Sequence, residues 1–407
     1  MAVGGLREFR ARRQVRAVAA SCFRRTRSSA RRTDINGRRT KRVTNKTASQ
    51  TGPTVADVVA ALDGLTGGRV TSSDGGRNPY VISKDSGIPG KAVTERPGLV
   101  WGASDKAVRR LAVAMTITEH HIELAHASGV DAIVAHHPIA DAASSGGVTL
   151  ADYLSLYGIA VLECHEAFHG LHPGMAYLHG HQPFYVNPAY DGVHGLVVMV
   201  GRPLPGVTTV GDVLTRLDAG LERSLDLRIL DGERSVRQCA DLVDSATAPG
   251  MRVLAGALDD PLGEVVLHAF PHTGFGEKQL AQLLAEYPAI STVIFSISAA
   301  PPDSAVVASA AARGLSVLVG SSHASEVFEN GLPLAFGLSA LLPNVDVVLF
   351  RDRVVSIPIN SVGTGALREY GRSVAQEHLL PLAEAVRARA AATTLAATPL
   401  SHSEHAS

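Results

Sequence analysis

The chain has 407 residues, of which 45% are hydrophobic and 19% are charged, and its formal net charge is zero. This composition is that of a folded globular protein and excludes a chain that is disordered or fibrous throughout. No run approaches the roughly 18 apolar residues of a transmembrane helix, so we expect no membrane span. Three cysteines (Cys22, Cys164 and Cys239) exclude a disulfide framework and favour a reducing, cytoplasmic compartment.

In chain order, the first feature is a basic amino-terminal segment that the zero net charge conceals. Residues 1–50 contain thirteen arginines and two lysines against Glu8 and Asp34, a local charge of +13. Such a segment could bind nucleic acid, or it could be an organelle transit peptide. Because it has almost no apolar periodicity, we expect residues 1–52 to be a disordered tail and exclude them from the fold.

The apolar pattern from residue 53 to residue 363 predicts an α/β fold. Strands are predicted at 98–102, 111–115, 130–136, 159–164, 194–200, 225–230, 251–255, 265–270, 292–297, 315–319 and 345–350. Helices are predicted at 54–62, 118–127, 149–157, 210–221 and 303–312, and two more begin near residues 276 and 333. Short links between strand, helix and strand imply parallel strand pairs.

Two long segments fall outside this alternation of strands and helices. Residues 65–97 are rich in Gly, Ser, Asp and Pro and are predicted to be a surface loop. Residues 364–407 are predicted to be an appended helix, at about 374–391, and a disordered tail.

Histidines are concentrated in one part of the chain, since ten of the seventeen lie between His120 and His181. The strand at 130–136 ends in His136 and His137, followed by Pro138. Neighbouring side chains on a strand point to opposite faces, so both histidines can serve one site only where the strand has become a loop. Open α/β sheets bind ligands at the carboxyl ends of their strands. The pair is therefore a candidate for metal binding, and the alternative is two partly exposed loop histidines.

A second strand, at 159–164, also ends in histidine. If the chain turns helical after Cys164, His165 and His169 lie at i and i+4 on one face, a standard geometry for two ligands of one metal. Glu166 would face elsewhere on that turn. His179 and His181 follow in a segment that we expect to be more exposed.

A third strand, at 315–319, leads to a histidine and a glutamate. Ser322 can cap a helix in which His323 and Glu326, at i and i+3, share a face. Three strand ends thus carry five histidines and one carboxylate, which predicts a metal site. The predicted ligands are His136, His137, His165, His169, His323 and Glu326.

Imidazole and carboxylate donors suit divalent Zn, Fe, Mn, Co or Ni, and spacing does not choose among these metals. Six donors exceed what one tetrahedral zinc requires, so one or two ions per subunit are expected. Metal ions that lower the pKa of a bound water support a hydrolase or cyclohydrolase.

Other kinds of catalytic or nucleotide-binding site have less support. No G-x-S-x-G nucleophile elbow, Walker A loop or well-placed G-x-G-x-x-G is present. Cys164 beside His165 could be an activated thiol, but sequence neighbours seldom have the geometry of a nucleophile and its base.

The run Gly-Val-Asp-Ala-Ile-Val-Ala-His-His-Pro-Ile at 129–139, together with His165 and the segment 320–326, resembles a known family. This is the dinuclear-metal-centre hexameric family, whose members are often labelled GTP cyclohydrolase 1 type 2 homologues. The resemblance spans roughly residues 54–357. It implies two similar α/β lobes with mixed, largely parallel sheets that face a central metal site. The lobes would comprise about 53–195 plus 290–363, and 196–289. It also implies a homohexamer.

The chain departs from the family pattern at two expected ligands. The family usually has aspartate four residues after its second histidine, where this chain has His169. The histidine of the closing motif falls at Ser322, so His323 would replace it from one position along. These departures make the chain a divergent relative.

The family label implies attack of metal-activated water on C8 of the guanine ring of GTP. We predict Glu326 as the catalytic residue. We therefore expect a metal-dependent hydrolase or cyclohydrolase acting on a nucleotide or related heterocycle. A non-catalytic metal-binding or regulatory scaffold is the alternative. Nucleic-acid binding is expected only through the basic tail.

Overall fold

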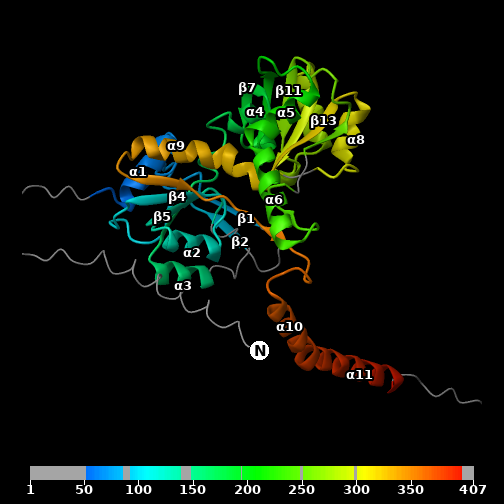
Figure 1. Ribbon diagram of the computed structural model, residues 1–407. Coiled ribbons are helices and arrows are strands. Elements are labelled where there is room, and N and C mark those ends of the chain that lie inside the picture. The colour runs from blue at the N-terminus through cyan, green and yellow to red at the C-terminus, as the bar shows by residue number, and fades with distance from the viewer. Residues whose placement is uncertain are drawn as a thin grey trace, which may run out of the picture. The chain divides into compact units, whose positions relative to one another are not determined.

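The computed structural model describes residues 52–85, 92–138, 148–193, 195–247, 251–297 and 300–396. All of them belong to the unit Thr51–Ser407. Two large sheets with helices on their faces confirm the predicted α/β fold (Figure 1). The predicted tail at 1–52 lies almost wholly outside the described residues.

The first sheet has five strands in the order β14-β4-β5-β6-β3. Their bounds are β3 Gly98–Trp101, β4 Arg110–Ala114, β5 Ala132–Ala135, β6 Ala160–Glu163 and β14 Asp346–Leu349. All neighbours pair in parallel except β3, which pairs antiparallel with β6. The predicted βαβ unit, with a strand on each side of the helix at 118–127, is confirmed.

Helices cover both faces of this sheet because its strands are apolar on both sides. On β5, Ala132 and Val134 join one core cluster, and Ile133 and Ala135 join another. The first cluster packs under α1 (Val55–Leu65) and α9 (Leu332–Leu341). The second packs under α2 (Glu119–Ala127) and α3 (Val148–Tyr157). Figure 1 shows these two helices on the opposite side of the sheet from α1 and α9.

The second sheet has six strands in the order β10-β13-β12-β11-β8-β7. Their bounds are β7 His181–Asn187, β8 Val198–Pro203, β10 Arg252–Ala255, β11 Val265–Ala269, β12 Ile290–Ile297 and β13 Ser316–Ser322. The central β11, β12 and β13 are parallel, and the outer strands are antiparallel to their neighbours. The sheet packs against α4 (Gly174–Leu178), α5 (Val210–Gly220), α7 (Glu277–Glu286) and α8 (Ala305–Ala312).

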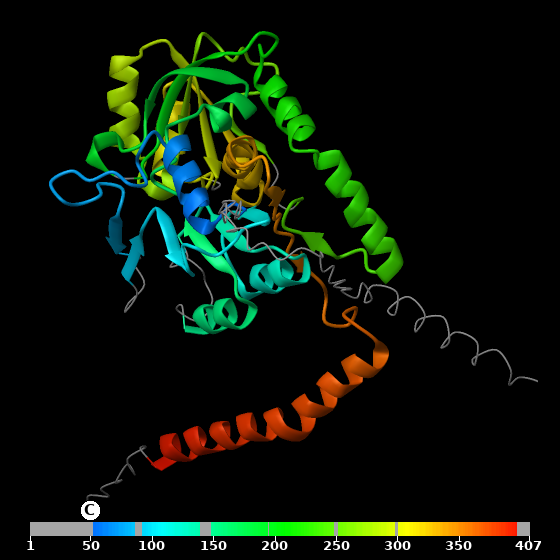
Figure 2. The same cartoon turned by 90° about the vertical axis from the view of Figure 1, so that its left-hand side faces the viewer.

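The remaining elements are short or peripheral. They are the hairpin β1 (Ile82–Asp85) and β2 (Ala92–Glu95), the pair β9 (Val243–Asp244) and β15 (Val355–Ser356), and the helices α6 (Arg223–Arg237), α10 (Gly365–Val374) and α11 (Leu380–Ala396). Figures 1 and 2 both show α10 and α11 extending away from the two sheets. None of the helices in the described ranges combines the length and apolar content that a membrane span needs.

Three sequence predictions about the fold are wrong. The predicted strand at 225–230 is part of helix α6, and the predicted loop at 65–97 contains the β1–β2 hairpin. The predicted lobe boundaries at residues 195 and 290 also fail, because β7, β12 and β13 all pair with the second sheet. β12 continues the parallel order begun by β11, which fixes it in that sheet.

Candidate metal centre

His136 and His137 directly follow β5, as predicted. Their backbone N–H groups donate to the carbonyls of Ala114 and Met115 at 2.9 and 2.7 Å, so pairing with the neighbouring chain continues past the strand. Both side chains are buried, and their ring centroids are 5.3 Å apart. The chain bends at these two residues, which brings neighbouring side chains to one place. The alternative of exposed loop histidines is excluded.

His165 and His169 follow β6 on one turn of chain. The N–H of His169 donates to the carbonyl of His165 at 3.2 Å, which confirms the predicted i, i+4 arrangement. Their ring centroids are 4.5 Å apart, and both rings lie within 5.3 Å of the His136 ring. The turn therefore adds two imidazoles to the pair that follows β5.

Glu326 reaches the same place from the other sheet. It follows β13 and the 3₁₀ turn His323–Ser325, and precedes the π-helix Val327–Gly331. The predicted capped helix is thus a 3₁₀ turn and a π-helix instead. The side chain of His323 lies outside the described part of the structure, so its predicted role stays a prediction.

The donor atoms form two overlapping groups around His136. His136, His137 and Glu326 lie within 4.8 Å of one another, and so do His136, His165 and His169. The Nε2 atoms of His136 and His137 are 3.6 and 3.2 Å from the Glu326 carboxylate oxygens. Two ligands bonded to one ion at about 2.0–2.2 Å have roughly this separation. Five of the six predicted ligands are therefore brought together.

Hydrogen bonds determine which ring nitrogens can bind a metal. Nδ1 of His136 donates to the carbonyl of Cys164 at 2.9 Å, since that oxygen can only accept. By the same reasoning, Nδ1 of His165 donates to Glu95 at 2.9 Å, and Nδ1 of His169 to Glu166 at 3.2 Å. In the neutral rings Nε2 then carries the lone pair, as a metal ligand requires.

Burial keeps the central histidine neutral. Removal from water, followed by the charge of the nearby His165, holds the pKa of His136 well below its ordinary value. Its Nε2 is fully buried and has no hydrogen-bond partner among the described residues. A buried, deprotonated, unpartnered imidazole nitrogen beside a carboxylate fits a divalent transition metal.

Cys164 does not behave as an activated thiol. Burial raises its pKa to about 12, so the thiol stays protonated at neutral pH. Its carbonyl, rather than its sulfur, serves the site by fixing His136. The thiol alternative considered from the sequence therefore loses its support.

Sequence reasoning missed three residues that contact these histidines. Thr116 Oγ1 is 2.8 Å from Nδ1 of His137, and Glu95 and Glu166 accept from His165 and His169. Glu95 lies in the segment that we expected to be a loop. In the structure Thr94 and Arg96 are exposed and Glu95 between them is buried. Glu166 was expected to face away, but its carboxylate lies between the two rings.

A second group of histidines is buried in the six-stranded sheet. His179 and His181 are fully buried, which contradicts the expected exposure, and their rings lie 4.7 and 5.4 Å from that of His268. The prediction failed because Gly320 and Gly201 leave space for the two rings. Burial lowers the pKa of His179 to about 4 and that of His181 to about 3. It raises the pKa of the neighbouring Glu329 to about 8.

Substituting Gly320 by alanine is expected to destabilise the fold. A Cβ there would lie 2.1 Å from Nε2 of His179, which accepts a hydrogen bond from the backbone of Ser321 at 2.9 Å. Overpacking of this kind costs about 1–3 kcal/mol, measurable by urea unfolding. Gly232→Ala on α6 is the control, because a Cβ there meets nothing within 4 Å. It should stabilise the helix by roughly 0.5–1 kcal/mol. Equal effects of the two substitutions would contradict the packing.

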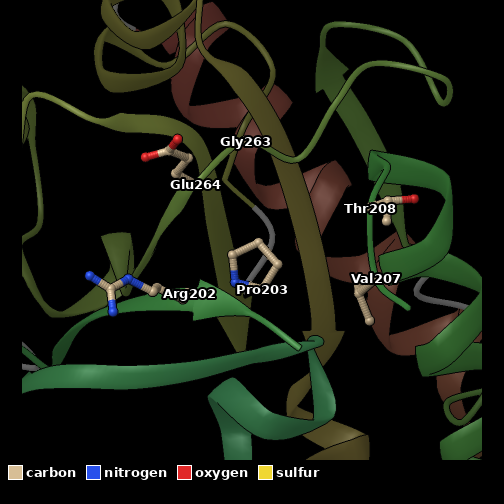
Figure 3. Close-up of a pocket in the computed structure, with 6 residues that line it drawn as sticks. All are labelled: Arg202, Pro203, Val207, Thr208, Gly263 and Glu264. Carbon is tan, nitrogen blue, oxygen red and sulfur yellow. The ribbon is translucent and has the colours of Figure 1, made fainter. Parts of the chain in front are cut away.

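A surface hollow of about 500 Å³ lies elsewhere on the second sheet (Figure 3). Its lining residues are Arg202, Pro203, Val207, Thr208, Gly263 and Glu264. Gly263 and Glu264 precede β11, whereas Glu326 follows β13, which runs parallel to it through β12. The hollow is therefore at the amino ends of these strands and shares no residue with the metal groups.

The model of the Duf34/NIF3 (NGG1p interacting factor 3) family matches residues 88–144. This segment contains β5 and the double histidine, and the match confirms the resemblance that these motifs predicted. A comparison with curated proteins gave no significant match.

Several solved structures are similar to this chain at low identity. A Bacillus cereus protein related to NIF3 is 14% identical with a TM-score of 0.47, covering 74% of this chain and 97% of that chain. Reduced HcgD from Methanocaldococcus jannaschii is 16% identical with a TM-score of 0.47, covering 73% and 97%. TTHA1606 from Thermus thermophilus is 18% identical with a TM-score of 0.44, covering 74% and 99%.

Proposed function

We propose, because this chain is a divergent relative of the Duf34/NIF3 family, that it is a metal-dependent hydrolase or cyclohydrolase. The observation that carries the proposal is the convergence of His136, His137 and Glu326 from two sheets on a pair of further histidines. The donors are mainly imidazole nitrogens, which favour Zn, Fe, Co or Ni over Mg or Ca. Mn fits less well, since it prefers oxygen donors.

A bound divalent metal would supply a Lewis acid that lowers the pKa of water. The side chains of the protein would hold the ion and accept a proton. His136 and His137 would hold the ion through Nε2, with their rings fixed by Cys164 and Thr116. Glu326 would complete the set and accept the proton that water loses. Burial of these groups would exclude bulk water and strengthen their electrostatic effect.

The proposed substrate is a nucleotide such as GTP or a related heterocycle, attacked by water at an electrophilic ring carbon. This part of the proposal comes from the family label. A homohexamer also comes from the family, and a cytoplasmic location from the low cysteine content. Both stand as parts of the same proposal.

The test combines metal analysis with a turnover assay. Purified protein should contain at least one equivalent of transition metal, and it should convert GTP or another nucleotide in a metal-dependent way. Glu326→Gln should abolish this turnover. Less than one equivalent of metal, even after incubation with Zn²⁺ or Co²⁺, would contradict metal binding itself.

A non-catalytic metal-binding scaffold is the second candidate. It is favoured by His169, which leaves Glu326 as the only carboxylate in the two groups that contain His136. A scaffold would bind metal with the same ligands but show no turnover with any nucleotide tested. Metal-dependent turnover that Glu326→Gln removes would exclude it.

A further inference from the structure

Two buried glutamates lie behind the histidines that follow β6. Glu95 Oε2 is 2.9 Å from Nδ1 of His165, and Glu166 Oε2 is 3.2 Å from Nδ1 of His169. The other oxygen of Glu166 is 4.0 Å from Nδ1 of His165, so this carboxylate lies between the two rings. Glu95 and Glu166 are only 3% and 7% exposed.

The local chain explains why these glutamates point inward. Glu95 is the last residue of β2, and its neighbours Thr94 and Arg96 are exposed, as the alternation of a strand requires. Glu166 occupies the turn that links His165 to His169. Burying a carboxylate is costly unless it is hydrogen-bonded. Two such residues beside one pair of histidines therefore suggest a role at that pair.

We propose that Glu95 and Glu166 are positioning residues that hold His165 and His169 as Nε2 ligands of the metal centre. The inference rests on the metal binding proposed above. A carboxylate that accepts from Nδ1 fixes the tautomer and orientation of the ring and makes the opposite nitrogen a better donor. The β1–β2 hairpin, which lies outside both large sheets, thus delivers a residue to the site.

Charge gives a second, independent reason for the two glutamates. Four neutral imidazoles and the Glu326 carboxylate would leave a divalent ion with a net charge of about +1 in a buried place. Glu95 and Glu166 bring two negative charges to the far side of the ligand rings. They would lower the cost of burying the ion.

The test measures metal affinity in the full-length protein. Co²⁺ and Zn²⁺ binding are compared, by competition with a chromophoric chelator, in wild type, Glu95→Ala, Glu95→Gln and Glu166→Gln. We expect each substitution to weaken binding about 10–100-fold. Alanine should weaken it more than glutamine at position 95, because the amide still accepts a hydrogen bond. The visible spectrum of bound Co²⁺ should also change, which a purely structural role would not cause.

Asp352→Ala is the matched control. Asp352 accepts from Nε2 of His121 at 2.8 Å, a pair of the same kind that belongs to neither group around His136. The Asp352→Ala substitution should leave the Co²⁺ affinity and the spectrum of bound Co²⁺ unchanged. Thermal unfolding of each metal-free variant checks that it is folded, and Glu166→Gln replaces Glu95→Ala if the latter is not.

The outcomes separate this inference from the proposed function. A wild type that binds neither metal overturns both. If the wild type binds metal and the Glu95 and Glu166 variants bind it with affinities within twofold of the wild type, the positioning role alone is overturned. Loss of a whole equivalent at saturating Co²⁺ also overturns it, because Glu95 or Glu166 would then be a direct ligand.

Discussion

Replacing His136 by alanine is expected to abolish metal binding at the concentrations present after purification. His136 is the one residue common to both of the groups that surround it. Loss of a residue that only hydrogen-bonds to a metal ligand typically weakens metal affinity about 10–100-fold, so loss of a ligand itself should weaken it by more than about 100-fold. Elemental analysis and Co²⁺ titration measure the effect.

His121→Ala is the control for this substitution. His121 is also a buried histidine, but it pairs with Asp352 and belongs to neither group around His136. It should retain the wild-type metal content. If His136→Ala retained full metal content and affinity, the assignment of the metal centre to these residues would be wrong.

Acidification is expected to destabilise the metal-free protein strongly. The pKa of His179 is lowered to about 4 and that of His181 to about 3, and that of His268 is lowered well below its ordinary value. In each case burial is the largest cause. At each of these histidines the unfolded chain therefore binds a proton near pH 6.5, whereas the folded chain stays unprotonated until the pH is much lower. The contribution of these histidines to the free energy of unfolding is therefore complete above pH 6.5 and is lost as the pH falls towards 4 and 3.

Each of these histidines should lower the free energy of unfolding by about 1.4 kcal/mol per pH unit below 6.5. Glu329 acts in the opposite direction. Its pKa is raised to about 8 by burial, so its contribution is full below pH 4.5 and is lost as the pH rises to 8. The effect of the three histidines is larger than that of the one glutamate, so acidification lowers the free energy of unfolding.

Urea unfolding of metal-free protein at pH 7, 6 and 5 measures this loss. His181→Leu should reduce the pH dependence by one proton, because it removes one of the buried histidines that the folded chain keeps neutral. His120→Leu makes the same substitution at an exposed histidine of α2 and is the control for loss of a histidine side chain. An unfolding free energy that stays flat from pH 7 to pH 5 would contradict the buried neutral histidines.

The fold was predictable wherever burial produces a simple apolar pattern. β5, β6 and β11 are buried on both faces, so their largely apolar runs predicted strands at almost the observed bounds. β7 was missed because it is an edge strand that contains Pro183 and polar residues.

Helix α6 misled the sequence reasoning for the opposite reason. Residues 225–230 alternate apolar and polar side chains as a half-buried strand does. In the structure Leu225, Leu227 and Ile229 are exposed, whereas Asp226 and Leu230, one helical turn apart, are buried. Arg351 pairs with Asp226 at 3.0 Å, a contact across 125 residues that no local pattern reveals.

The site was predictable where ligands follow strands and not where the chain supports them from a distance. His136, His137, His165 and His169 were found because strand ends meet at one edge of a sheet. Glu95 is 70 residues from His165, and its position depends on how the hairpin folds back. The burial of His181 likewise depends on the absence of a side chain at Gly201.

The placement of Glu326 would make a bound metal ion a cross-link between the two sheets. The histidines belong to the sheet that contains β5 and β6, and Glu326 to the sheet that contains β13. An ion bonded to both would close a loop of about 190 residues and restrain hinge motion between the two sheets. Metal release and lobe opening would then be one thermodynamically linked event, so metal supply would set the stiffness of the molecule as well as the chemistry of its site.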